Sequence, residues 1–156
     1  MKALVIYYSR TGNTKIAGEA IARELGCDVE EIFDTVNRSG PIGWFMAGRQ
    51  ASGKMLTKLQ PLKKDLAGYD IVIIGTPVWA YTMSTPVRTL LAENKDKIKK
   101  VAFFLTMGGR GDATTFQGME EVCGKKPVAT LALLTKNVKN GTYVEAIKKF
   151  AGSLKA

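Results

Sequence analysis

The residues best suited to chemistry lie in one short turn near the amino terminus, Ser9-Arg10-Thr11-Gly12-Asn13-Thr14. This turn follows the apolar run Ala3–Tyr8 and opens a segment whose apolar residues repeat at helical spacing. The first backbone N–H groups of a helix have no partner inside the helix, and its dipole places partial positive charge there. Gly12 lets the backbone close, and hydroxyl groups add donors, so the turn predicts a phosphate site.

The alternative is a tight turn whose polar side chains only cap the helix, as such residues commonly do. The hydroxyl and amide side chains here exceed what a single cap requires, which favours phosphate binding. The turn matches neither G-x-G-x-x-G nor G-x-x-x-x-G-K-[ST]. Neither a dinucleotide fold nor a nucleoside triphosphatase is therefore indicated.

The composition narrows the chemistry further. No histidine occurs in the 156 residues, which excludes Ser-His and Cys-His nucleophile pairs and imidazole acid–base catalysis. Cys27 and Cys123 form no C-x-x-C motif, so an iron–sulfur cluster and a structural zinc site are excluded. Each of the two cysteines is expected to be a lone buried thiol. We predict no catalytic side chain and no metal ligand, and any redox chemistry must come from a bound organic cofactor.

The length of the chain and of its apolar runs indicates the number of domains and the cellular location. Residues 1–156 are predicted to form one domain, and no run approaches the length of a membrane span. The amino terminus enters a strand without a signal-peptide layout, so we expect a cytoplasmic protein.

The net charge is +9, and the segment from Thr35 to Lys64 holds six cationic residues and no acidic one. This segment could face an anionic partner, a nucleic acid or a membrane surface, or it could be the solvated face of a crossover helix, which we favour. No nucleic-acid motif accompanies it. Helical spacing within the segment predicts that Trp44 and Met55 are core contacts.

Apolar runs alternate with helical patterns along the whole chain. The predicted strands are Ala3–Tyr8, Val29–Phe33, Ile71–Gly75, Val101–Thr106 and Val128–Leu134. The predicted helices are Thr14–Leu25, Trp44–Leu56, Pro86–Glu93, Thr115–Cys123 and Tyr143–Leu154. The pattern predicts an α/β fold, a three-layer doubly wound sandwich around a five-stranded parallel sheet. Charges in the second strand place it at an edge, which matches the strand order 2-1-3-4-5.

Two further turns are expected beside the first one. Gly75-Thr76-Pro77-Val78-Trp79-Ala80-Tyr81 includes the end of the third strand, and Thr106-Met107-Gly108-Gly109-Arg110-Gly111-Asp112 includes the end of the fourth. Ligands of such sheets bind at the carboxyl ends of the strands, so the three turns should share one rim.

These turns, in this order on this topology, resemble those of the flavodoxins over nearly the whole chain. The resemblance implies that Ser9, Arg10, Thr11, Gly12, Asn13 and Thr14 hold the phosphate of FMN. It implies that Trp79 flanks the flavin ring beside Thr76, Pro77, Val78 and Ala80, with Met107, Gly108, Gly109 and Asp112 as further ring neighbours. For Trp79 the alternative is core packing, and for Arg10 it is a solvated side chain.

The chain departs from the usual flavodoxin pattern in two places. Many flavodoxins carry a glycine beside the ring, whereas the corresponding stretch here offers Val78, Trp79 and Ala80 after the rigid Pro77, and alanine reaches positive φ only at a cost. The third turn lacks the tyrosine that often covers the opposite ring face, and Phe116 is a distant substitute.

The resemblance implies an electron carrier that shuttles electrons between redox partner proteins. The basic surface favours partners with an acidic docking face. The alternative is an FMN-dependent oxidoreductase that passes electrons from NAD(P)H to a quinone-type acceptor. A flavin-binding interaction or sensor module is the weaker third class.

The charge yields a first testable prediction. Flavodoxins are usually acidic, and negative surroundings oppose the anionic, fully reduced flavin. A chain of net charge +9 should oppose it less, so its second reduction potential should be less negative than is usual for the family. A potentiometric titration of the FMN-loaded protein measures this, and a very low second potential would contradict it.

Overall fold

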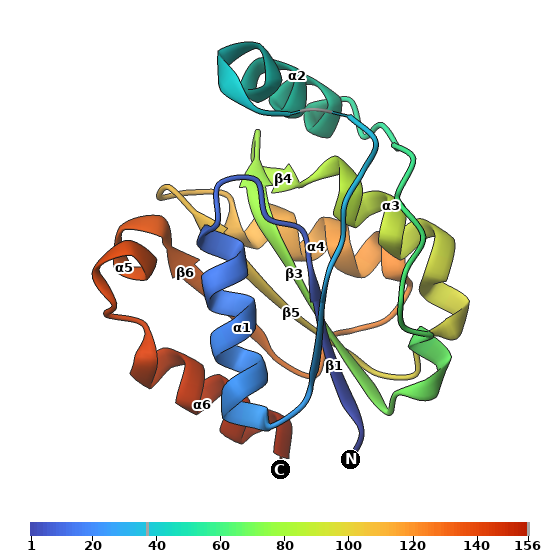
Figure 1. Cartoon of the computed structure of the whole chain (residues 1–156), viewed down its shortest axis with the longest axis vertical. Helices are drawn as coiled ribbons and strands as arrows, with labels where there is room; N and C mark the ends of the chain where they lie inside the picture. Colours follow the sequence, from blue (N-terminus) through green and yellow to red (C-terminus); the bar gives the residue numbers. More distant parts are fainter. Residues whose placement is uncertain (37, 156) are drawn as a thin grey trace.

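The computed structural model describes residues 1–36 and 38–155 (Figure 1). Within these residues, five parallel strands stand in the order β2-β1-β3-β5-β6, and a short strand, β4, pairs antiparallel with the end of β3. The order confirms the predicted doubly wound sheet with its second strand at an edge. The strands are β1 (Ala3–Tyr7), β2 (Asp28–Glu31), β3 (Ile71–Trp79), β4 (Thr82–Met83), β5 (Val101–Met107) and β6 (Thr130–Leu134).

Helices cover both faces of the sheet, and one helix lies apart. In Figure 1, α1 and α6 lie on one face, α3 and α4 lie on the other, and α2 stands above the carboxyl ends of the strands. The helices are α1 (Asn13–Leu25), α2 (Gly40–Ser52), α3 (Thr85–Asn94), α4 (Asp112–Cys123), α5 (Thr135–Asn140) and α6 (Val144–Lys155), with 3-10 turns at Leu66–Gly68 and Lys95–Lys97.

Two apolar cores explain why the central strands are almost wholly apolar. Successive side chains of a strand point to opposite faces, so Leu4 and Ile6 enter the core beneath α3 and α4, while Val5 and Tyr7 enter the core beneath α1 and α6. The edge strand β2 differs. Its buried Glu30 accepts hydrogen bonds from the backbone N–H groups of Lys63 and Lys64 at 2.8 and 2.9 Å, so the long connection protects that edge.

The structure differs from the sequence predictions around α2. This helix begins at Gly40 rather than Trp44, with Pro41 in its first turn, where proline fits because no N–H partner is needed there. The prediction that Trp44 and Met55 are core contacts is wrong, since they are 67% and 51% exposed. The helix buries only its small residues Gly43, Ala47 and Ala51, which allow it to approach the domain closely.

Three further elements were not predicted as they stand. Strand β3 runs to Trp79 instead of ending at Gly75, the hairpin partner β4 was missed, and the short helix α5 precedes α6. None of the helices in the two described ranges is long and apolar enough to cross a membrane. Both thiols are unbridged, and burial raises the pKa of Cys27 and of Cys123.

A glycine pair tests the packing of the sheet. A Cβ at Gly75, in the centre of β3, would collide with the ring of Phe104, so Gly75→Ala should lower the free energy of unfolding by about 1–3 kcal/mol. A Cβ at Gly152, on the exposed side of α6, would meet nothing, so Gly152→Ala should raise it by about 0.5–1 kcal/mol. Urea unfolding measures both, and changes of equal sign would contradict the packing.

Candidate functional site

The three predicted turns meet at the carboxyl ends of β1, β3 and β5. There they line a hollow of about 300 Å³, within the range of small-molecule sites. Nine predicted site residues line it: Arg10, Thr11, Asn13, Thr14, Pro77, Val78, Trp79, Met107 and Gly108. Four residues that were not predicted as site residues complete the lining: Trp44, Thr106, Thr135 and Lys139.

Ser9 shapes the first turn. Its Oγ accepts hydrogen bonds from the backbone N–H groups of Gly12 and Lys15, each at 3.1 Å. Gly12 has a φ of 97°, a conformation that glycine adopts readily, and the ladder of α1 begins with the Ile16 N–H donating to the Gly12 carbonyl at 3.0 Å. The N–H groups of Asn13 and Thr14 precede that first bond, so they remain outside the ladder beside the hollow. Ser9 thus has the capping role, while the helix end keeps donors for an anion.

Arg10 ties the first turn to the start of α2. Its Nε donates to the carbonyl of Arg38 at 2.8 Å, and its Nη2 donates to the carbonyl of Gly40 at 3.0 Å. The Arg10 side chain is therefore part of the framework rather than freely solvated. Thr14 and Thr106 share a buried hydroxyl–hydroxyl hydrogen bond of 2.8 Å, which joins the first turn to the end of β5.

A buried ion pair lies between α2 and the end of the sheet. The Nε of Arg38 contacts Oδ2 of Asp34 at 2.8 Å, and the two side chains are 2% and 3% exposed. The guanidinium lies 5.4 Å from the centre of the Trp79 ring, which meets Tyr8 edge to face. Among the described residues, Nη1 and Nη2 of Arg38 have no hydrogen-bond partner. Burial, reinforced by Asp34, raises the pKa of Tyr8 to about 12, so its phenol stays neutral.

The second turn is a strained hairpin between β3 and β4. Trp79 pairs with Thr82, which leaves Ala80 and Tyr81 as a two-residue turn, with φ of 49° and 65°. This turn requires positive φ at both positions and normally uses asparagine and glycine. Ala80 and Tyr81 thus both adopt a left-handed conformation that their side chains disfavour.

The third turn holds this hairpin in place. The Thr114 hydroxyl, in the first turn of α4, donates to the Tyr81 carbonyl at 2.6 Å. A Cβ on Gly111 would lie 2.9 Å from Val78 and 3.1 Å from the Tyr81 backbone, so only glycine allows this approach. The second and third turns are therefore one packed unit.

Six predicted site residues lie outside the lining of the hollow. Thr76 is fully buried, and its Oγ1 accepts the Ser84 N–H at 3.0 Å, just before α3 begins. Ala80 lines a neighbouring hollow instead. The other four are Ser9, Gly12, Gly109 and Asp112, which belong to the turns around the hollow.

The four residues that sequence reasoning missed differ in how they could have been found. Thr106 and Thr135 end or directly follow strands at the same rim, so the rule for the carboxyl ends of parallel strands could have included both. Thr135 also donates to the Met107 carbonyl at 3.0 Å. Lys139 lies on the unpredicted helix α5, and Trp44 reaches the hollow only because α2 lies across the rim. Phe116 packs against the core instead.

A second hollow, apolar and about 470 Å³ in volume, adjoins the first along the flank of α2. The two hollows share Trp44, Val78 and Trp79. The rest of the lining comes from Phe45, Ala47, Gly48, Arg49 and Ala80.

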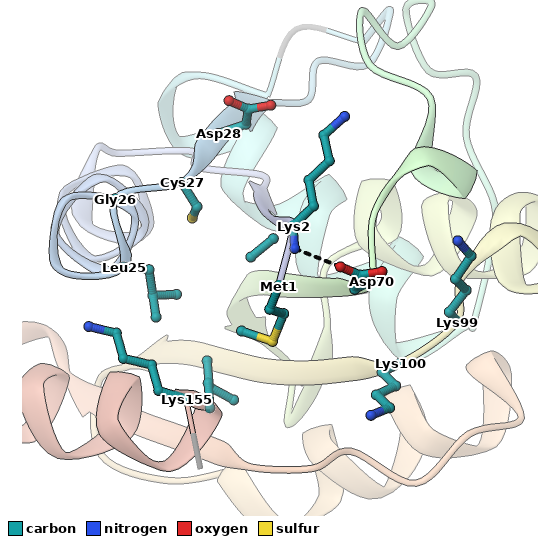
Figure 2. Close-up of a pocket in the computed structure, with 12 residues that line it drawn as sticks. Met1, Lys2, Leu25, Gly26, Cys27, Asp28, Asp70, Lys99, Lys100 and Lys155 are labelled. Carbon is teal, nitrogen blue, oxygen red and sulfur yellow. Dashed lines mark hydrogen bonds between the residues drawn. The ribbon is translucent and has the colours of Figure 1, made fainter.

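A larger hollow of about 980 Å³ lies at the opposite end of the sheet (Figure 2). There the N–H of Lys2 donates to Asp70 at 2.7 Å, and the lining joins the amino ends of the strands to the last residues of α1 and α6. Helix carboxyl ends carry partial negative charge, and ligands of such sheets bind at the other end. Both points favour the rim of the three turns over this hollow as the place for an anion.

The comparisons with known proteins agree with this fold. The family model described as Flavodoxin matches residues 2–149, so the chain belongs to the flavodoxin family. Flavodoxin 1 of Salmonella typhimurium is 30% identical over 77 residues, a stretch that covers 49% of this chain and 31% of that protein.

Solved structures are similar over more of the chain. A flavoprotein of Lactobacillus acidophilus, solved in complex with FMN, is 26% identical, with 90% of this chain and 98% of that one covered and a TM-score of 0.75. Flavodoxin 2 of Bacillus cereus has the same fold, with 19% identity, coverage of 98% and 97%, and a TM-score of 0.63.

The ion pair beneath α2 yields a prediction with a matched control. Asp34→Asn leaves the buried Arg38 guanidinium without its counter-charge, so it should lower the free energy of unfolding by about 3–5 kcal/mol. Glu31→Gln breaks the more exposed contact with Lys15, 3.5 Å long, and should cost less than about 1 kcal/mol. Urea unfolding measures both, and equal effects would show that Arg38 is solvated.

Proposed function

We propose that this protein binds FMN in the hollow of the three turns and carries electrons between redox partner proteins. The observation that carries the proposal is the meeting of the α1 amino terminus with the carboxyl ends of β3 and β5 around one small-molecule-sized hollow. The family membership and the FMN-bound relative from Lactobacillus acidophilus support it.

The residues present fit FMN by their chemistry. A phosphate needs donors and positive charge, and the α1 amino terminus offers N–H groups and the hydroxyl of Thr11, with no acidic residue in its first turn. Lys139 adds a cation to the lining. A flavin ring needs apolar and aromatic neighbours, and Trp44, Trp79 and Met107 line the same hollow.

FMN, when bound, supplies the electron-transfer chemistry, and the protein supplies binding and orientation. The first turn would hold the phosphate, with Ser9 and Gly12 fixing its shape through the bonds described above. Trp44 and Trp79 would exclude water from the ring. No titrating side chain is required for this role, which accords with a chain that contains no histidine.

The second candidate is an FMN-dependent reductase that takes electrons from NAD(P)H and passes them to a quinone-type acceptor. The apolar hollow next to the candidate flavin site favours it, since that hollow has the size and lining for a ring-shaped molecule. The carrier remains the first choice because the sequence contains no separate nicotinamide-binding motif. We expect the partner of a carrier to present an acidic face to this basic chain.

FMN titration tests the binding site. Gly12→Ala places a side chain at a φ of 97° in the first turn and should weaken FMN binding by about tenfold or more, measured by quenching of flavin fluorescence. Gly26→Ala makes a similar change at the other end of α1, where φ is 63°, and should leave FMN affinity unchanged. A wild-type chain that binds no FMN, or equal losses in both variants, would overturn the proposed site.

Anaerobic addition of NADPH to the FMN-loaded protein separates the two functions. A carrier should keep its flavin absorbance until a partner reductase is added. Rapid bleaching by NADPH alone would favour the reductase and reject the carrier.

A further inference from the structure

Helix α2 exposes its large apolar side chains and buries its small ones. Its buried residues, Gly43, Ala47 and Ala51, stand four apart on one face. The opposite face carries Ile42, Phe45 and Met46, which are 77%, 63% and 38% exposed. A surface helix normally directs its large apolar residues to the core, so this helix has the reverse arrangement.

Trp44 widens this surface on the flank of the helix, where it is 67% exposed. We call the four side chains of Ile42, Trp44, Phe45 and Met46 the α2 ridge. Figure 1 shows α2 as the outermost element above the carboxyl ends of the strands, and all four ridge side chains are exposed. A projecting apolar surface of this kind indicates an interaction site.

Within the segment that carries the ridge the charge has one sign, and the nearby Glu121 of α4 shares a hollow with the cations Lys54 and Arg88. From Thr35 to Lys64 the chain holds no acidic residue, and Arg49, Lys54 and Lys58 are exposed within it. Arg49 follows Ile42, Phe45 and Met46 on the same helical face, seven residues after Ile42. Asp34, just before this segment, is buried against Arg38 and adds no negative charge to the surface. The surface that covers the ridge must therefore be anionic as well as apolar.

The ridge has almost no hydrogen-bonding groups. From Pro41 to Gly48 the only polar side-chain group is the indole N–H of Trp44. Protein interfaces carry about one hydrogen bond per 100–200 Å², whereas the acyl boundary of a bilayer requires none. Exposed tryptophan and phenylalanine beside arginine and lysine are typical of helices that lie in the interface of an anionic membrane.

We propose that the α2 ridge docks this protein on an anionic lipid bilayer, with α2 lying in the interface. Ile42, Phe45 and Met46 enter the boundary between headgroups and acyl chains, and Arg49, Lys54 and Lys58 contact the anionic headgroups. Because Trp44 also lines the hollow of the three turns, docking brings the mouth of that hollow close to the lipid. The proposal does not depend on which ligand the hollow binds.

Vesicle binding tests the proposal with the full chain. At low salt the protein should co-sediment with vesicles of phosphatidylcholine that contain about one third phosphatidylglycerol. Far less protein should co-sediment with vesicles of pure phosphatidylcholine. Trp79 is 9% exposed and Trp44 is the exposed tryptophan, so binding should shift the emission to shorter wavelength. Trp44→Phe should abolish that shift while most sedimentation remains.

Matched variants distinguish binding through the ridge from binding that depends only on overall charge or hydrophobicity. Ile42→Ser with Phe45→Ser should lower the lipid-bound partition about tenfold or more, whereas Val128→Ser with Val144→Ser, at residues 54% and 49% exposed, should not. Lys54→Gln with Lys58→Gln should weaken binding, whereas Lys148→Gln with Lys149→Gln, exposed on α6, should have less effect at the same net charge.

Three results would overturn the proposal. The first is no binding to the anionic vesicles at low salt. The second is equal loss in the ridge variants and their controls. The third is binding to polyglutamate as tight as to vesicles and unaffected by Ile42→Ser with Phe45→Ser, which would identify an acidic protein as the partner.

Discussion

Burial of the parallel sheet on both faces is the constraint on which this molecule depends. Because helices cover each face, the central strands carry apolar side chains and have no surface left for a ligand. Turns and helix amino termini gather only where the strands end, so polar groups for binding collect at one rim. The buried bond between Thr14 and Thr106 joins two of these turns, which lie 92 residues apart in the sequence.

A buried ion pair, Arg38 with Asp34, helps to position α2, the helix that lies across that rim. Arg10 holds the backbone of Arg38 and Gly40, and Arg38 in turn lies between Asp34 and Trp79. An ion pair so deeply buried contributes little net stability, because removing both charges from water costs nearly what their attraction returns. Its value is geometric: together with the Arg10 hydrogen bonds it ties the segment just before α2 to Asp34 and to the first turn.

The sequence predicted the fold because its signals were local and agreed with one another. Apolar runs that alternate with helical patterns predicted a parallel sheet, and charges in the second strand placed that strand at the edge where it is found. The failures came where burial depends on distant contacts. Trp44 has the spacing of a core residue, yet α2 packs through Gly43, Ala47 and Ala51, and no local pattern states which side of an apolar helix faces inward. Lys139 was missed because α5 is too short to show periodicity.

The hairpin of Ala80 and Tyr81 constrains how this chain can change in sequence. Two left-handed residues with side chains cost about 1–2 kcal/mol each, and the contacts from Gly111 and Thr114 offset that cost. The four positions therefore form one epistatic unit, in which a replacement at any of them alters the effect of replacements at the others. Related chains with a glycine in this hairpin should tolerate more variety at the start of α4, since their turn needs less support.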